Sequence, residues 1–126
     1  MVSLSKFKSQ RFQSSVYNRI SPGTYRSVIT YADEASSEKY AEGTAIELRY
    51  TLTDSSGNSF SHQEIFFLSN GNSRTARFLD YLEENNILPE NLTELVGCQE
   101  EVIIRKNGSL PSIVDRKYLG RDDEGG

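Results

Sequence analysis

The sequence of 126 residues has little of the chemistry on which many enzymes and metalloproteins depend. It contains a single cysteine, Cys98, and a single histidine, His62. One cysteine cannot form an intramolecular disulfide, and one cysteine with one histidine cannot build a Cys/His zinc site within a chain. We therefore expect no metal, no cofactor and a cytoplasmic, reducing environment.

Long hydrophobic runs are also missing. No stretch approaches the roughly 18 apolar residues of a transmembrane helix, and the first 20 residues lack the apolar run of a signal peptide. The hydrophobic fraction is 36% and the charged fraction 25%. This apolar share is below the globular average, so we expect one domain with some solvated segments and no contact with membranes.

The net charge of −4 is distributed unevenly along the chain. Residues 1–20 carry four basic and no acidic side chains, whereas residues 21–120 carry nine basic and fifteen acidic ones. The pattern predicts a flexible basic arm over residues 1–21, a folded domain over residues 22–120 and an acidic, exposed tail over residues 121–126.

The clearest structural signal is an alternating strand over residues 44–54. Ile46, Leu48, Tyr50 and Leu52 fall on one face, with polar residues between them. A polar turn over residues 54–58 joins this strand to the next, which predicts a hairpin. The predicted strands are 24–32, 44–54, 59–68, 100–106 and 113–119.

A helix is predicted over residues 74–87, with Asn72 or Ser73 as its N-cap. Its core stripe is Phe78, Leu79 and Leu82, and a short helical turn is expected between residues 89 and 97. The residues predicted to be buried are Ile46, Leu48, Tyr50, Leu52, Phe78, Leu82, Val96 and Ile103.

The order of these elements predicts a mostly β fold with one main helix. Five strands with a helix between the third and the fourth match an OB-fold-like barrel, which is small and partly open. A two-layer α+β sheet with one helix on its back and a small β-sandwich remain as alternatives.

Residues 23–119 resemble a known group of proteins in the order and spacing of several short pieces. These pieces are Gly23-Thr24-Tyr25, Gly43, Arg77-Phe78-Leu79, Tyr81-Leu82, Leu95-Val96-Gly97 and the closing run from Pro111 to Arg116. The group comprises small phage and mobile-element proteins related to single-stranded-DNA-binding proteins. The resemblance implies single-stranded DNA binding in replication, recombination or transfer of a mobile element.

Binding of a single strand requires aromatic platforms for bases and cations along the backbone. On an OB barrel these come from strands two and three and from the one-two and four-five loops. The candidates from these elements, with others from strand five, are Lys39, Tyr40, Arg49, Phe60, His62, Arg105, Lys106, Arg116 and Lys117. We expect Tyr40, Arg49, Phe60 and Lys106 to lie around one groove.

Each candidate also has a simpler interpretation. Core packing explains an aromatic residue, solubility explains a cation, and a surface position or a cross-strand contact explains His62. Glu38, Glu42 and Glu47 lie close to the candidates in sequence and would oppose a phosphate backbone.

Catalysis is not expected. No Gly-x-Ser-x-Gly elbow and no phosphate-binding loop occurs, and the neighbouring carboxylates Glu100 and Glu101 point to opposite faces of a strand. Two hypotheses follow. The chain binds single-stranded DNA without sequence specificity, with replication or recombination proteins as candidate further partners, or it is an OB-fold module that binds only proteins.

Overall fold

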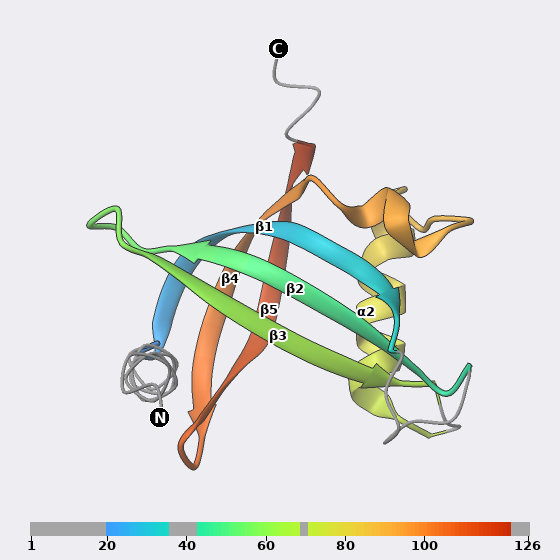
Figure 1. Cartoon of the computed structure of the whole chain (residues 1–126), viewed down its shortest axis with the longest axis horizontal. Coiled ribbons are helices and arrows are strands. Elements are labelled where there is room, and N and C mark those ends of the chain that lie inside the picture. The colour runs from blue at the N-terminus through green and yellow to red at the C-terminus, as the bar shows by residue number, and fades with distance from the viewer. Residues whose placement is uncertain (1–19, 36–42, 69–70, 122–126) are drawn as a thin grey trace, which may run out of the picture.

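The computed structural model describes residues 20–35, 43–68 and 71–121. In these residues five strands form one antiparallel sheet in the order β3-β2-β1-β4-β5, accompanied by one α-helix and one short 3₁₀ helix (Figure 1). The elements are β1 (Gly23–Glu34), β2 (Ala45–Thr53), β3 (Ser59–Phe67), α2 (Ser73–Glu84), η1 (Leu92–Leu95), β4 (Cys98–Asn107) and β5 (Leu110–Arg121). Residues 1–19, Lys39, Tyr40 and the tail after Arg121 lie outside the described residues. Neither helix is long and apolar enough to cross a membrane.

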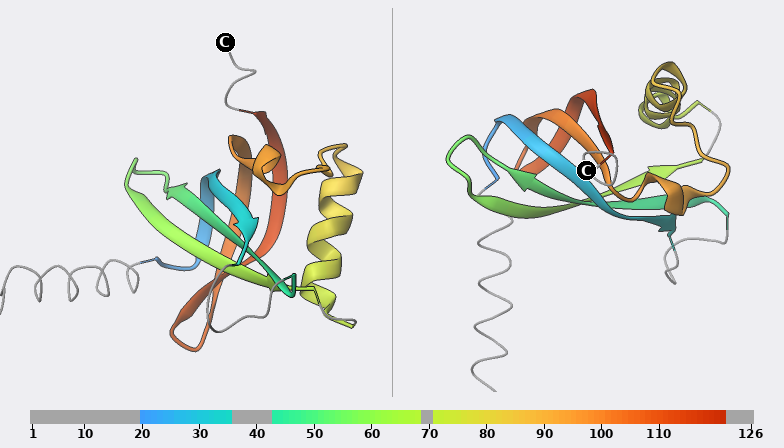
Figure 2. Two further views of the ribbon diagram at one scale, coloured as in Figure 1. Left: turned by 45° about the vertical axis from the view of Figure 1, so that its right-hand side comes forward. Right: turned by 90° about the horizontal axis from the view of Figure 1, so that it is seen from above.

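β1 organises the sheet because it pairs with two neighbours. Its residues from Arg26 onward pair with β2, and its residues from Gly23 to Val28 pair with β4. A register shift between Ile29 and Tyr31 marks a bulge, and bulges bend a strand and increase its twist. The sheet is therefore curled rather than flat, as Figure 2 shows.

The curled sheet is not a closed barrel. β3 and β5 are its two end strands, and no backbone ladder joins them in the described part of the chain. The mostly β composition, the five strands and the position of the helix between β3 and β4 agree with the sequence prediction.

The helix begins as the sequence predicts. Asn72 is the N-cap, and its side-chain oxygen accepts a hydrogen bond of 3.0 Å from the Thr75 N–H. The helix ends at Glu84, and Asn86 follows with a left-handed φ of 58°, a conformation that asparagine tolerates better than most residues. The short helical turn predicted between residues 89 and 97 is η1.

The core lies on the concave face of the sheet, beneath α2 and η1. Six of the eight predicted core residues are buried, namely Ile46, Leu48, Tyr50, Leu52, Phe78 and Leu82. The packing adds Val102, Ile104, Leu95 and, before the first strand, Ile20. The folded body therefore extends into the predicted N-terminal arm by at least this one residue.

Three apolar residues were assigned to the wrong side. In β4 the alternation places Val102 and Ile104 inside, so Ile103 points outward and is 37% exposed. Val96 caps the C-terminal end of η1 and is exposed, while its neighbour Leu95 is buried. Leu79 is exposed on the outer side of α2.

The assignment of faces in β4 predicts a contrast between two neighbouring isoleucines. Ile104→Ala should lower the free energy of unfolding by about 2–5 kcal/mol, because it leaves a cavity in the core. Ile103→Ala is the matched control and should cost less than about 1 kcal/mol at its exposed position. Urea denaturation measures both, and equal losses would contradict the assignment.

Candidate functional site

Charged side chains occupy several inward positions of the sheet. Glu64 on β3, Glu100 on β4 and Arg116 on β5 lie inside, with side-chain exposures of 3%, 1% and 9%. A buried charge is costly unless it is paired and hydrogen-bonded. The three side chains meet that requirement by contacting one another.

Arg116 is the centre of this buried network. Its Nη1 donates to both carboxylate oxygens of Glu100, at 3.1 Å each. Its Nη2 donates to the hydroxyl of Tyr50 at 2.8 Å and to Glu64 Oε1 at 2.9 Å. The guanidinium also lies over the Phe78 ring, 4.7 Å from its centroid.

Glu64 gathers donors from both sides of the gap between β3 and β5. Its Oε2 accepts a hydrogen bond of 3.1 Å from the backbone N–H of Ile113 on β5. Arg74 on α2 lies 3.1 Å from the same oxygen, and the ring nitrogen Nε2 of His62 lies 3.3 Å from it. Side chains thus bridge the two end strands where no backbone ladder does.

The network changes the acidity of its members. Burial alone would raise the pKa of Glu64, but the hydrogen bond with His62, the charge of Arg116 and the Ile113 N–H lower it to about 2. Burial alone would lower the pKa of Arg116, but the Tyr50 hydroxyl and the carboxylates of Glu100 and Glu64 hold it above its ordinary value. Burial raises the pKa of Tyr50. The carboxylate and the guanidinium therefore both stay charged.

This placement changes the role of two predicted binding residues. His62 is buried opposite Tyr50 on the neighbouring strand and stacks on it with ring centroids 5.8 Å apart. Arg116 is committed to Glu64 and Glu100. Neither is positioned to meet a ligand on the outer face of the sheet. Of the two simpler interpretations of His62, the cross-strand contact is present and the surface position is wrong.

The outer face of β1, β2 and β3 carries a different arrangement. Arg49 points outward and lies over the ring of Tyr31, with its guanidinium carbon 4.4 Å from the ring centroid. Arg49 also forms a salt bridge with Glu47 on the same strand. Opposite Arg49 on β3 stands Gln63, which is exposed. We call Tyr31, Arg49, Thr51, Ser61 and Gln63 the outer-face patch.

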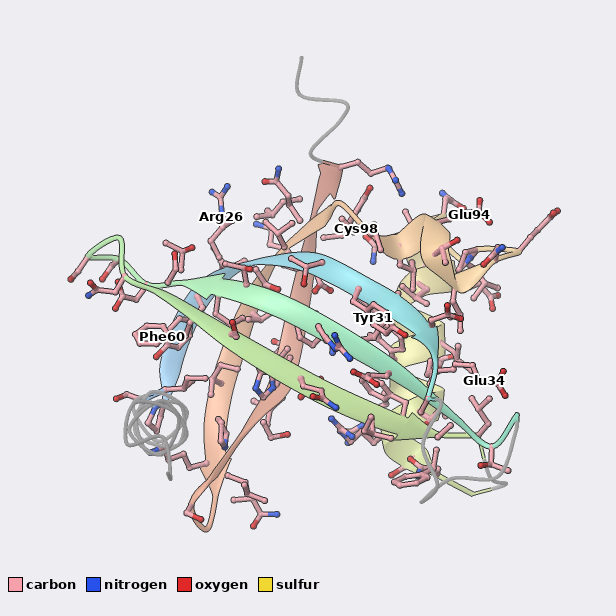
Figure 3. All side chains as sticks on the ribbon, viewed as in Figure 1. Arg26, Tyr31, Glu34, Phe60, Glu94 and Cys98 are labelled. Atoms are coloured by element: carbon pink, nitrogen blue, oxygen red, sulfur yellow. The ribbon has the colours of Figure 1, made fainter. Side chains whose placement is uncertain are left out.

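The other predicted residues do not surround a single groove with Arg49. Phe60 lies opposite Leu52 and packs against the core and Tyr25, so it belongs to the inner face. Figure 3 places Phe60 near the start of β3 and Tyr31 toward the other end of the sheet.

The basic residues of β4 and β5 are also distant from Arg49. Arg105 and Lys106 are exposed beside the β4–β5 turn, just beyond the pairing of Ile104 with Gly23. The stretch of β1 from Gly23 to Tyr31 separates them from Arg49, which corresponds to roughly 27 Å of strand. Lys117 is exposed in a row with Glu101 and Arg26.

Two functional features were missed by the sequence reasoning. Tyr31 was assigned to a strand without a role, because the bulge that turns it outward has no signal in the sequence. The burial of Glu64 could have been predicted from the sequence. In the alternation of β3 it falls on the same inward-facing side as Phe60, His62 and Phe66. A carboxylate in such a row requires a buried cation.

A cleft of about 440 Å³ lies between α2 and β5, and we call it the α2–β5 cleft. Figure 2 shows the two elements side by side. The aromatic side chains at the cleft are Phe66, Phe78 and Tyr81, and five consecutive β5 residues, 112–116, line its other side. The described residues contain no group of three His, Cys, Asp or Glu side chains placed to hold a metal ion.

Comparison with known proteins gives no match to a family model, a curated protein or a solved structure.

The buried network predicts an acid-sensitive fold. Because the folded-state pKa of Glu64 is about 2, below its ordinary 4.5, its charge stabilises the fold above about pH 4.5. This stabilisation, on the order of 3 kcal/mol, disappears as the pH falls from 4.5 toward 2. Glu64→Gln should destabilise the protein at neutral pH by about 3–5 kcal/mol and weaken its dependence on pH in that window.

Urea midpoints measured between pH 2 and pH 6 test this prediction. Glu83→Gln, at an exposed position of α2, is the control and should keep the parent's profile. If the urea midpoint of Glu64→Gln fell between pH 4.5 and pH 2 as steeply as that of the parent, the role of this carboxylate would be contradicted.

Proposed function

We propose that this chain is an OB-fold-like domain that binds single-stranded DNA without sequence specificity. The strand order, the first strand shared between two halves of the sheet and the helix between β3 and β4 support the fold assignment. OB-folds are partly open five-stranded barrels. An opening between β3 and β5 that side chains bridge is compatible with this architecture.

The observation that carries the DNA proposal is the pair formed by Tyr31 and Arg49. A partly exposed aromatic ring with an exposed guanidinium stacked on it offers a flat surface to a nucleobase and a cation to its phosphate. Such stacking tolerates every base, because every base has a π-face. The neighbouring Thr51, Ser61 and Gln63 offer uncharged hydrogen-bonding groups to a strand lying across the sheet.

Further cations provide a path for the phosphates. Arg26 and Lys117 lie on the outward side of the sheet, although Glu101 stands between them in the same row. Arg105 and Lys106 lie beyond, at the β4–β5 turn. Lys39 and Tyr40 lie between β1 and β2 in the sequence, outside the described residues, and remain candidates through that position.

The biological setting is proposed from the sequence resemblance. Replication, recombination or transfer of a phage or mobile element requires proteins that cover single strands without reading their sequence. In this proposal the chain is a binding module and not an enzyme.

The alternative is a module that binds only proteins. The α2–β5 cleft favours it, because an aromatic cleft beside an end strand is suited to an extended peptide. Dependence on salt separates the alternatives. Binding through phosphates weakens by about 0.7 log units per log unit of salt for each phosphate neutralised on a single strand.

Titration of labelled poly-dT at two salt concentrations tests the DNA proposal. Tyr31→Ala should weaken binding by about 1–3 kcal/mol, because a stacking platform is lost. Tyr31→Phe keeps the ring and should bind like the parent. Arg49→Ala should weaken binding and reduce the salt slope, since it removes a phosphate contact.

Arg77→Ala is the control for the loss of a positive charge, because Arg77 is exposed on α2, away from the outer-face patch. Affinities of Tyr31→Ala and Arg49→Ala equal to that of Arg77→Ala would refute the site. Absence of poly-dT binding by the parent at low salt would refute DNA binding altogether.

A further inference from the structure

The α2–β5 cleft has the form of a site for an added strand. β5 is an end strand of the sheet, and among the described residues no strand lies beside its outer edge, where the Ile113 N–H is bonded to Glu64. The cleft is lined by the consecutive residues 112–116, which means that the edge of β5, and not only one of its faces, borders the cleft. A helix wall opposite an open strand edge is a recurring arrangement for binding an extended peptide.

The walls of the cleft define two kinds of contact. On the helix side Arg74, Phe78, Tyr81 and Glu84 follow the spacing of one helical face. Phe66 and Phe78 stack at 4.6 Å beneath the cleft, almost fully buried and covered by the guanidinium groups of Arg74 and Arg116. The apolar surface that a ligand can reach is that of Tyr81, which is partly exposed, and of Val114, which is half exposed. A segment in the cleft would therefore place apolar side chains against Tyr81 and Val114 and the alternate ones at the rim.

The exposed charged residues around the cleft, which we call its rim, favour a basic segment. Beneath the cleft Glu64 and Glu100 are balanced by Arg116 and Arg74. The remaining charged residues of the lining are one cation and three acids, all exposed and in no ion pair with another described residue: Arg77, Asp80, Glu84 and Asp115. The rim is therefore acidic overall.

The chain itself contains a segment of this chemistry. Residues 1–19, which lie outside the described structure, carry four cations and no acid. In Lys6-Phe7-Lys8 an extended backbone would direct Phe7 to one side and both lysines to the other. Arg11-Phe12 continues the mixture of basic and aromatic residues.

The N-terminal segment is long enough to reach the α2–β5 cleft from the point where it joins the folded body. Gly23 stands opposite Ile104, which stands opposite Ile113 at the end of the cleft, so Gly23 lies about 10 Å from Ile113 across two strand spacings. The chain from Phe7 to Ile20 spans up to roughly 45 Å when extended. The segment can therefore reach the cleft of its own chain.

We propose that the basic N-terminal segment around Lys6-Phe7-Lys8 binds in the α2–β5 cleft of the same chain as an added strand along β5, beyond Ile113. Phe7 contacts Tyr81 and Val114, and the lysines meet the carboxylates at the rim. This interaction is independent of the proposed DNA binding, because it uses the opposite side of the sheet from the outer-face patch.

Tryptophan fluorescence tests the proposal directly, since the chain contains no tryptophan. In the full-length Phe7→Trp variant the emission should lie at shorter wavelength than in Tyr17→Trp, and acrylamide should quench it several-fold less. Adding Glu84→Lys to Phe7→Trp should abolish both effects. Glu83→Lys is the matched control, because Glu83 is the neighbouring exposed acid of α2 and does not line the cleft.

Three results would overturn the proposal. The first is an emission of Phe7→Trp equal to that of the urea-unfolded chain. The second is an equal response to Glu84→Lys and Glu83→Lys. The third is a blue shift that disappears on dilution, which would show that the segment comes from a second copy. No DNA is present in these measurements, so their outcome does not depend on the proposed function.

Discussion

The contact between Glu64 and Arg116 holds the two ends of an open sheet together. Among the described residues no backbone ladder joins β3 and β5, and the Glu64 carboxylate crosses the gap by binding both the Arg116 guanidinium and the Ile113 N–H. Arg116 in turn holds Glu100 and the hydroxyl of Tyr50. Since these residues come from four strands, the network is satisfied only when all four adopt one curvature. Burying the charges costs solvation energy, and the number of partners offsets that cost.

The two end strands are protected in different ways as a consequence. The first turn of α2 covers the edge of β3, where Arg74 donates to the Ile65 carbonyl at 2.9 Å and Thr75 donates to the Phe67 carbonyl at 2.7 Å. These contacts occupy backbone acceptors that would otherwise be open to another strand. On β5 the comparable contact is the Ile113 N–H bound by Glu64, and the α2–β5 cleft lies beside residues 112–116. The helix thus closes one edge of the sheet and leaves space beside the other.

The sequence predicted the elements of the fold well and the positions of its charged residues poorly. Alternation in residues 44–54 and the cap at Asn72 are local signals, and the structure follows both. The register of β4 has no such signal, because Val102, Ile103 and Ile104 are all apolar and the face that is buried depends on pairing with β1 and β5. Arg116 was assigned to a surface for the same reason. Its partners Glu64 and Glu100 are distant in sequence, and only the assembled sheet brings them together.

The candidate binding surface depends on a balance between neighbouring charges more than on the net charge of −4. Arg49 is held by Glu47 on its own strand and by the ring of Tyr31 on the next. A phosphate that approaches Arg49 therefore has to replace a carboxylate partner, so the gain is the difference between two ion pairs and not the full value of one. A base stacking on Tyr31 would likewise have to displace the Arg49 guanidinium from the face of the ring. Each contact at this position would therefore contribute only a net gain, and useful affinity for a single strand would require several such contacts along its length.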